Sequence, residues 1–188
     1  YTQTYTNVGE LENKGIEVAV DAKVVDGNDF DWDTRITYTA NKNVVNSING
    51  VDSLVYVSQL FGDPASALIV GESYGVFYGS RAARDSEGNL LIDPSTGFII
   101  EAEDQGVVGD PNPDFMLGFS NSLSFKGLTL SFLLDLKYGG DLYSNSIVAM
   151  LGRGVTQDTE DRERTMVIPG VYGDATTTQP ILDGNGNT

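Results

Sequence analysis

Two long runs of alternating residues follow each other in the sequence with almost nothing between them. From Phe115 to Phe125 every second residue is apolar, except one asparagine, and the residues between are mostly small or polar. The same pattern runs from Leu128 to Tyr138. A period of two places successive side chains on opposite faces of a β-strand. The stretch therefore predicts an antiparallel hairpin with one apolar and one polar face.

A second pair of alternating runs lies upstream. Ile16–Val24 and Trp32–Ala40 each alternate, and the turn-rich segment 26–31 connects them. The sequence thus predicts an all-β fold whose main elements are four antiparallel strands. We expect these strands near residues 7–25, 32–48, 114–126 and 128–143.

The connections differ greatly in length. The two predicted hairpins have short turns, whereas residues 49–113 and 144–188 form long segments, the second with one short helix expected at Asn145–Arg153. Ten acids fall between Asn49 and Pro113, against only two arginines. Strict alternation of tight turns with long loops is typical of outer-membrane barrels, whose long loops lie outside the cell.

Composition excludes several classes of function. The net charge of −16 argues against a nucleic-acid partner, since phosphate binding needs clustered Lys and Arg. The sequence has no Cys and no His, which removes thiol chemistry, zinc sites and His-based acid–base catalysis. Catalysis by carboxylates is not removed by these absences.

Membrane insertion through a helix is also excluded, because no apolar run approaches the eighteen residues that a spanning helix needs. A spanning β-strand needs only about ten alternating residues, so the strands above qualify. No signal peptide opens the sequence, which begins as if in the middle of a strand.

Strands with one apolar and one polar face occur in two kinds of fold. One is a soluble antiparallel sandwich, and the other is a membrane barrel with lipid outside and water in its lumen. Three features favour the barrel. The strands are about twelve residues long, beyond the five or six usual in globular proteins. Aromatic residues stand at the ends of the apolar face, and the polar face is mainly Ser, Thr, Gly and Asp. Asn121 fits poorly on a lipid face, and a local bulge would repair the register there.

Four strands cannot close a barrel, since the smallest barrels have eight, and an open sheet in lipid would leave unpaired edges. If the strands span a membrane, we therefore expect this chain to be a fragment of a larger barrel domain, with residues 1–188 all belonging to it.

Several ordered motifs resemble one family. NVGELENKGIEVAV (7–20), WDTRITYTANKNVV (32–45), VGESYGVFYGS (70–80) and GDPNPDF…GGDLYS (109–144) are similar, in this order, to barrel segments of the SusC/RagA-like branch of TonB-dependent outer-membrane transporters. Together the motifs cover most of residues 7–144, whereas the segment after Ser144 matches only loosely.

The resemblance implies a 22-stranded barrel with an N-terminal plug domain that this chain lacks. It implies a Gram-negative outer-membrane location, with the segments 49–113 and 144–188 at the cell surface. The implied function is TonB-dependent import of glycan or peptide fragments, so we expect a transport protein that is not an enzyme. The implied partners are a SusD-like surface lipoprotein, TonB acting through the missing plug, outer-membrane lipid, and an oligosaccharide or oligopeptide cargo; no nucleic acid is expected.

The motif residues that carry the resemblance on the barrel itself are Gly15, Glu17, Pro113, Asp114, Gly139, Gly140 and Asp141. We expect Gly15 to permit close backbone approach within a strand. Glu17 has two interpretations: a partner for a cation of the lumen or plug, or a residue of the barrel wall that forms an ion pair there or is solvated in the lumen.

The loop after residue 70 carries aromatic and arginine side chains suited to contact with cargo or lid: Tyr74, Phe77, Tyr78, Arg81 and Arg84. The alternative is that the aromatics pack the loop onto the barrel rim. Asp85–Asp93 and Asp183–Thr188 faintly resemble calcium loops, but Asx and Gly turns explain both, so no cofactor is expected.

Two rival functions stay open from the sequence. One is a secreted, soluble all-β domain that binds glycans or cell surfaces through the same loops. The other is a β-rich hydrolase, with a carboxylate pair among Glu101, Glu103, Asp158, Glu160 and Asp161. Loop solubility is the simpler explanation of those acids.

Overall fold

The computed structural model describes residues 9–57, 64–163, 165–182 and 184. The chain divides into two compact units. The first contains the described parts of 1–57, 66–76 and 109–141, and the second contains those of 58–65, 77–108 and 142–188. Each unit is described by itself below.

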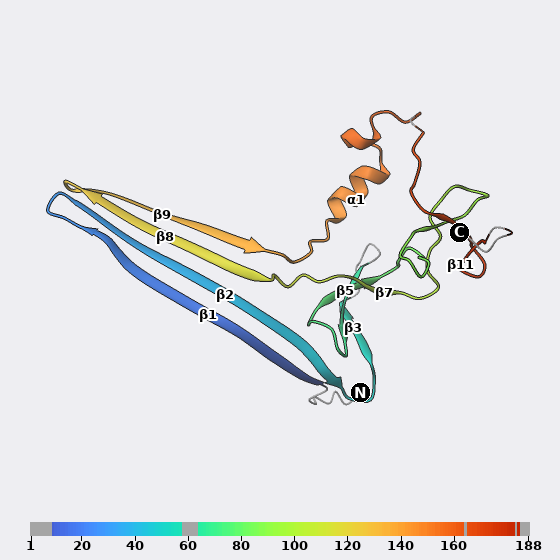
Figure 1. Ribbon diagram of the computed structural model, residues 1–188, viewed down its shortest axis with the longest axis horizontal. Helices are drawn as coiled ribbons and strands as arrows, with labels where there is room; N and C mark the ends of the chain where they lie inside the picture. The colour runs from blue at the N-terminus through green and yellow to red at the C-terminus, as the bar shows by residue number, and fades with distance from the viewer. Residues whose placement is uncertain (1–8, 58–63, 164, 183, 185–188) are drawn as a thin grey trace, which may run out of the picture. The chain divides into compact units, whose positions relative to one another are not determined.

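A four-stranded antiparallel sheet dominates the first unit, in the order β1-β2-β8-β9. Its strands are β1 (Gly9–Asp26), β2 (Phe30–Ile48), β8 (Phe115–Phe125) and β9 (Leu128–Tyr138). Figure 1 shows them as two long hairpins lying side by side. The all-β, antiparallel class expected from the alternating sequence is confirmed.

Both hairpins turn within a few residues. The β8–β9 turn consists of Lys126 and Gly127, with φ of 46° and 88°, the left-handed pair that a two-residue type I′ turn needs. Its twist matches that of the flanking strands, so the apolar alternation continues in register from one strand to the next.

Each face of the sheet has one character because the cross-strand register is regular. The apolar face combines side chains such as Val18, Tyr38, Leu117 and Leu136, which lie opposite one another across the four strands. Two register shifts interrupt the ladder, both in the β1–β2 pair, at Glu10/Leu11 and Lys23/Val25. Large apolar side chains remain exposed along this face, including most of those on β9.

The bulge expected at Asn121 is not present, and that prediction is wrong. Pairing runs unbroken through Asn121, which lies opposite Thr34 on one side and Phe132 on the other. Its side chain is buried, and its Oδ1 accepts a hydrogen bond from Trp32 Nε1 at 2.9 Å. The hydrogen bond from Trp32, and not a shift of register, thus accommodates the Asn121 amide. The Nδ2 atom of Asn121 has no hydrogen-bond partner among the described residues.

Aromatic rings gather at both ends of the apolar face. Tyr38, Phe115 and Tyr138 stack at one end, with ring centroids 5.7 Å apart for the first pair and 4.9 Å for the second. Phe30 and Phe125 lie directly opposite each other at the other end, next to Trp32. The middle of the face, which holds Phe119 and Phe132 beside several leucines, lies between these two aromatic groups.

Strand β9 ends at Tyr138, so the extent predicted for it, to residue 143, is too long. Gly139 and Gly140 have φ of 75° and 79°, outside the β region, and these angles end the strand. Within the segment expected to be loop, β3 (Ser53–Val57) and β4 (Ala65–Ile69) form a short antiparallel pair, which belongs to the first unit except for Ala65.

The second unit is built from short strands around a small core. Strands β6 (Leu91–Ile92), β10 (Val171–Asp174) and β11 (Gln179–Pro180) form one sheet in the order β11-β10-β6. Strands β5 (Val76–Gly79) and β7 (Gly106–Gly109) lie next to each other. Leu91, Ile100 and Ala83 are buried together, with Ala102 and Val171 packed against them.

Helix α1 (Asn145–Gly152) forms where a short helix was expected, and the 3₁₀ turn η1 (Gln157–Thr159) follows it. Ser144 caps α1, since its Oγ accepts a hydrogen bond from the Ile147 backbone N–H. Among the described residues, no helix has the length and apolar character required to span a membrane.

Candidate functional site

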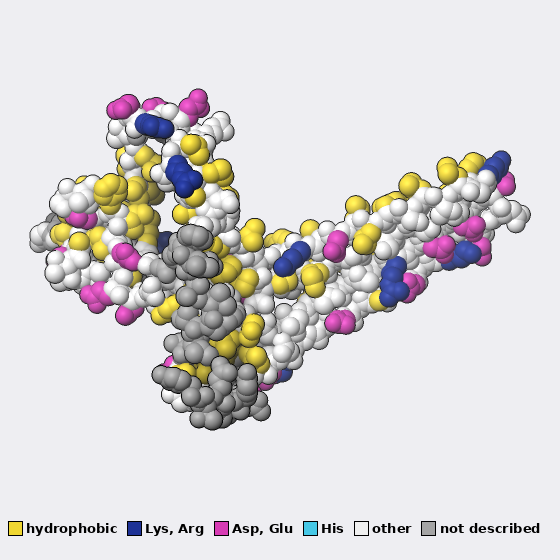
Figure 2. All heavy atoms as spheres, turned by 180° about the vertical axis from the view of Figure 1, so that it is seen from behind, with side chains coloured by type: hydrophobic (Ala, Val, Ile, Leu, Met, Phe, Trp, Pro, Cys, Tyr) yellow, Lys and Arg dark blue, Asp and Glu magenta, His cyan; other side chains and the backbone are white. Residues whose placement is uncertain are grey.

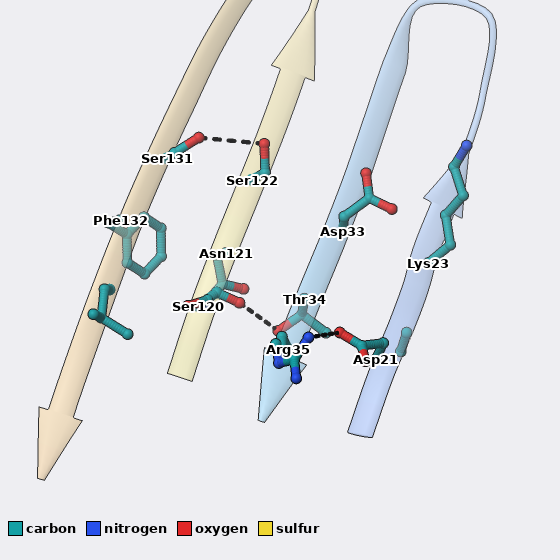
Figure 3. Close-up of a pocket in the computed structure, with 12 residues that line it drawn as sticks. Asp21, Lys23, Asp33, Thr34, Arg35, Ser120, Asn121, Ser122, Ser131 and Phe132 are labelled. Atoms are coloured by element: carbon teal, nitrogen blue, oxygen red, sulfur yellow. Dashed lines mark hydrogen bonds and ion pairs between the residues drawn. The ribbon is translucent and has the colours of Figure 1, made fainter. Parts of the chain in front are cut away.

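The polar face of the long sheet is a wall of small hydroxyl and charged side chains. Figure 2 shows acidic and basic side chains spread along the long sheet among the white atoms of backbone and uncharged polar side chains. Asp21 and Arg35, which are cross-strand neighbours, form an ion pair at 3.3 Å. On the other hairpin, Ser131 donates to Ser122 at 3.3 Å (Figure 3). Exposed pairs of this kind contribute about 0–1 kcal/mol each, so the face suits contact with water and polar ligands more than it stabilises the fold.

A depression of about 630 Å³ lies across the four strands at this level. Figure 3 shows the carboxylates, Lys23, Arg35 and the serines around it, contributed by all four strands. The arrangement provides many hydrogen-bonding groups at modest depth. Such groups can form hydrogen bonds and ion pairs with polar molecules.

Gly15 lies where two strands approach closely. A Cβ added there would be 2.5 Å from the Ala40 carbonyl oxygen, so only glycine fits without a shift. Glu17 lies on the polar face opposite Thr39, is exposed, and forms no ion pair with any described residue. The exposure of Glu17 is compatible with a solvated residue, and its pairing with a cation of the lumen or plug stays a prediction.

Pro113, Asp114, Gly139, Gly140 and Asp141 meet where β8 begins and β9 ends, a cluster we name the glycine–aspartate junction. Asp114 N–H donates to the Tyr138 carbonyl at 2.9 Å. A Cβ on Gly139 would lie 2.7 Å from the Asp114 carboxyl carbon, and one on Gly140 would lie 2.8 Å from the Pro111 carbonyl oxygen. The glycines of this motif are therefore required by close approach as well as by their positive φ.

Asp110 and Asn112 extend the junction and were not singled out from the sequence. Asp110 N–H donates to the Asp141 carboxylate at 2.8 Å, and Asn112 N–H donates to the Asp110 carboxylate at 2.9 Å. Burial raises the pKa of Asp110, but hydrogen bonds from Asn112 and Ser73 outweigh it and hold the pKa below its ordinary value. The sequence signal that could have identified them is the alternation of Asp and Asn with two prolines in residues 110–114.

Tyr74, one of the five loop candidates, belongs to the first unit and is exposed. Its backbone N–H donates to Asn43 Oδ1, and its carbonyl accepts from Asn112 Nδ2 at 3.0 Å. Asn43 Nδ2 in turn donates to Asn112 Oδ1 at 3.1 Å. Two asparagines thus hold the Tyr74 backbone to the end of the sheet.

The other four candidates belong to the second unit. Phe77 and Tyr78 lie in β5 and are half-buried, and their packing onto a barrel rim stays a prediction. Arg81 and Arg84 are exposed and line one groove, considered further below. The structure therefore brings the two arginines together, while Tyr74 falls in a different unit.

Asp85 and Asp93, at the ends of the first calcium-like segment, both use their carboxylates in local turns. Asp85 accepts from the Glu87 N–H at 2.9 Å and the Asn89 N–H at 2.8 Å, and Asp93 accepts from the Ser95 N–H at 2.8 Å. In the part of the chain that the structure describes, no group of three or more acidic side chains is placed to hold a metal ion. The second such segment, 183–188, lies outside the described residues apart from Gly184.

Glu101, Glu103, Asp158, Glu160 and Asp161, the acids of the hydrolase alternative, are all exposed. A glycosidase needs two carboxyl groups flanking an enclosed bond, with one held protonated by its surroundings. Their positions on the surface do not provide such a cleft.

The relatives found by comparison with known proteins are TonB-dependent receptors. The chain is 33% identical over 156 residues to the TonB-dependent receptor P26 of Formosa agariphila, a match that covers 73% of this chain and 16% of that protein. It is 28% identical over 153 residues to the TonB-dependent receptor SusC of Bacteroides thetaiotaomicron, covering 75% and 15%. No family model matches the chain.

The chain belongs to the SusC-like TonB-dependent receptors. It spans about one sixth of the length of the relatives that it matches. Among solved structures, it is similar to that of the RagAB peptide transporter, with a TM-score of 0.51 and 18% identity over 72% of this chain and 16% of that one. This likeness is one of fold, and it agrees with an open sheet that forms part of a β-barrel.

In this piece of a SusC-like sequence, the motif residues on the sheet and at the glycine–aspartate junction have a defined structural role. The loop candidates Tyr74, Phe77, Tyr78, Arg81 and Arg84 have positions but no demonstrated ligand, and their contact with cargo or lid stays a prediction.

Proposed function

We propose that this chain forms part of the wall of a Gram-negative outer-membrane barrel that imports oligosaccharide or oligopeptide fragments in a TonB-dependent manner. The observation that carries the proposal is the two-faced sheet. Its apolar face, interrupted only by Thr34 and Asn121 on β2 and β8, is largely exposed and is bounded by aromatic residues at both ends, while its opposite face is mainly small, polar and charged.

The height of the apolar face matches a membrane. Ten residue steps separate Phe115 from Phe125, and at about 3.4 Å a step the strand covers roughly 34 Å. Barrel strands tilt by about 40°, which reduces this length to about 26 Å along the membrane normal, close to the ~25 Å apolar band of outer-membrane barrels. A soluble sandwich has no need of that length.

The proposed energy source is supported by the relatives' names, and the proposed lipoprotein partner by the resemblance to the SusC/RagA-like branch. TonB-dependent receptors are named for their dependence on TonB, and RagAB is named as a peptide transporter. We extend both to this protein: TonB would act through a plug domain, and a SusD-like lipoprotein would close the outer side. The long segments after Ile48 and Asp141 would then face the outside of the cell.

The activity proposed is transport and not catalysis. The wall offers hydrogen-bonding groups at an open depression, without an enclosed pair of catalytic groups among the described residues. Work would be done at the plug by TonB, and these strands would provide the passage and its outer loops.

The rival function is that of a secreted, soluble glycan-binding domain. That protein would cover its apolar face with its own chain and would purify from water without detergent. The exposed leucines of β9 favour the membrane alternative, since a soluble domain rarely leaves so large an apolar face open.

The test uses the full-length protein in its native cells. Outer membranes would be isolated, the protein extracted with detergent, and uptake of labelled oligosaccharides and oligopeptides compared in cells with and without TonB. We expect a detergent-requiring outer-membrane protein whose deletion abolishes TonB-dependent uptake of at least one cargo class. Recovery in the soluble fraction, with unchanged uptake after deletion, would refute the proposal.

A further inference from the structure

A groove of about 670 Å³ opens on the second unit. Residues of the 80–84 segment form one side, Val107 and Val108 of the β7 region form another, and Ala102 and Thr178 complete it. Its volume lies in the range of small-molecule sites, about 300–1,000 Å³, which combine apolar walls with a few convergent polar groups. The polar side chains here are Ser80, Arg81, Arg84 and Thr178.

Arg81 is held in place by the backbone of β7. A Cβ added to Gly106 would lie only 2.5 Å from the Arg81 Cζ and Nε, so the guanidinium packs flat over the glycine. Arg81 Nη2 donates to the Asp104 carbonyl at 3.5 Å, a long contact. Arg84 Nη1 donates to the Gly88 carbonyl at 2.6 Å. Both side chains are thus anchored through one nitrogen and keep other N–H groups for a ligand.

Neither arginine forms an ion pair with an acid in the described residues, although the chain has 27 acids against 11 basic residues. Two guanidinium groups in one groove therefore lack a carboxylate partner within the described chain. Guanidinium groups bind carboxylate and sulfate strongly through paired, charge-assisted hydrogen bonds. The groove offers a place for such an anion.

Thr178 provides an independent sign that this groove is specialised. Its φ is 51°, in the left-handed region that a β-branched residue rarely adopts. Its backbone N–H donates to the Asp174 carbonyl at 2.8 Å, which holds this conformation. Strained residues of this kind concentrate at binding sites.

The floor of the groove favours a sugar over a peptide strand. Ala83 N–H donates to the Ile100 carbonyl, the Ala83 carbonyl accepts from Leu91, and the Arg81 carbonyl accepts from Ala102. With these groups already paired, an added peptide strand would find no free backbone edge along the floor. Recognition would instead use guanidinium and hydroxyl side chains, a set that suits the hydroxyls and the acidic group of a sugar ring.

We infer that this groove binds the carboxylate or sulfate group of an acidic oligosaccharide. The inference rests on the proposed import function and specifies the charge of its cargo. Because the chain as a whole is strongly acidic, binding depends on the local arginines, and added salt weakens it by screening.

The test measures binding by calorimetry to the full-length protein in detergent, separately from uptake. The probes are a tetragalacturonate, its neutral methyl ester, a sulfated tetrasaccharide and a Glu-rich tetrapeptide. Arg81→Gln/Arg84→Gln is compared with Arg153→Gln/Arg162→Gln, a control that removes the same charge from exposed positions of the same unit. We expect the groove variant to lose about tenfold or more in affinity for each arginine, and the control to match the wild type.

The probes also identify the anion. Preference for the galacturonate over its ester indicates a carboxylate, and preference for the sulfated sugar indicates a sulfate. Equal binding by the groove variant and the wild type, tighter binding of the peptide, or no binding of either acidic sugar would overturn the inference. Each of these results leaves TonB-dependent uptake of another cargo intact, so the proposed function is tested separately.

Discussion

The two units treat their apolar side chains in opposite ways. In the second unit Leu91 is 0% exposed, enclosed with Ile100 and Ala83. In the first unit Leu128 is 75% exposed, and the leucines that follow it along the apolar face of β9 are exposed as well. Full burial of one leucine stabilises a protein by about 1.5–3 kcal/mol. The exposed leucines of the sheet would gain this free energy only if another apolar surface covered them.

This difference indicates what surrounds each unit. The second unit resembles a small globular domain, with its own core and turns closed by Asp and Ser side chains. The sheet has two distinct faces and buries neither of them within the described chain. A sheet of this kind is suited to lipid on its apolar face and water on the other, and the following experiments compare the two units on that basis.

The largest effect is expected at the core of the second unit. Leu91→Ala should lower the stability of that unit by about 2–5 kcal/mol, because it leaves a cavity in close-packed surroundings. Leu136→Ala, on the exposed apolar face of β9, should cost far less, since lipid can fill the space. Hydrogen exchange of the 89–102 segment in the full-length protein measures the first change; equal effects of the two substitutions would contradict the contrast.

The next effect compares two adjacent leucines of β9 that face opposite sides. Leu134 and Leu133 are 60% and 63% exposed, but only Leu134 lies on the apolar face. Leu134→Lys should destabilise the barrel by about 2–4 kcal/mol, the cost of a cation near the middle of the bilayer, whereas Leu133→Lys should be nearly neutral. Urea unfolding in lipid vesicles measures both, and similar losses would argue against a lipid face.

A smaller effect is expected for the Trp32–Asn121 hydrogen bond, which joins β2 to β8. A double-mutant cycle with Trp32→Phe and Asn121→Leu should give a coupling energy of about 1 kcal/mol. Leu117→Ala, farther along the same face of β8 and opposite Tyr38 instead of Trp32, serves as the unpaired control for Trp32→Phe. Coupling indistinguishable from that control would mean that the bond does not help to hold the two hairpins together.

The smallest effect concerns the turn at Asp85. Hydrogen bonds from the Asn89 side chain, and from the backbone N–H groups of Asn89 and Glu87, hold the pKa of Asp85 below its ordinary value. Its contribution to stability is therefore present above about pH 4, the ordinary pKa of an aspartate, and is lost as the pH falls through the lowered folded pKa. Hydrogen exchange of residues 86–90, corrected for intrinsic rates, should lose protection on acidification, and Asp85→Asn should show no such pH dependence. Identical profiles would remove Asp85 as the cause.

Much of the sheet could be predicted from the sequence because alternation is a local signal. The period of two located β1, β2, β8 and β9 and assigned their faces. It could not account for Asn121, since the partner Trp32 lies 89 residues away. It also overestimated β9, because the positive φ of Gly139 and Gly140 depends on their close contact with the start of β8.

The loop groove was beyond sequence reasoning for a similar reason. Arg81 and Arg84 were noted as contact candidates, but Thr178 lies far along the chain, and no periodic pattern links it to them. The role of Gly106 as a platform for Arg81 appears only once β7 is folded beside the 80–84 segment. Contacts between distant irregular segments leave little trace in local sequence.

The central claim is that the two faces of the sheet meet different solvents, and spin labels along β9 test it most directly. Labels would be placed one at a time at each position from Leu128 to Tyr138 in the full-length protein in lipid, and their accessibility to oxygen and to a water-soluble nickel complex recorded. The account predicts a period of two, with oxygen contact at 128, 130, 132, 134 and 136 and nickel contact at 129, 131, 133, 135 and 137. Nickel contact on both faces, or exclusion of both reagents from the apolar face, would contradict it.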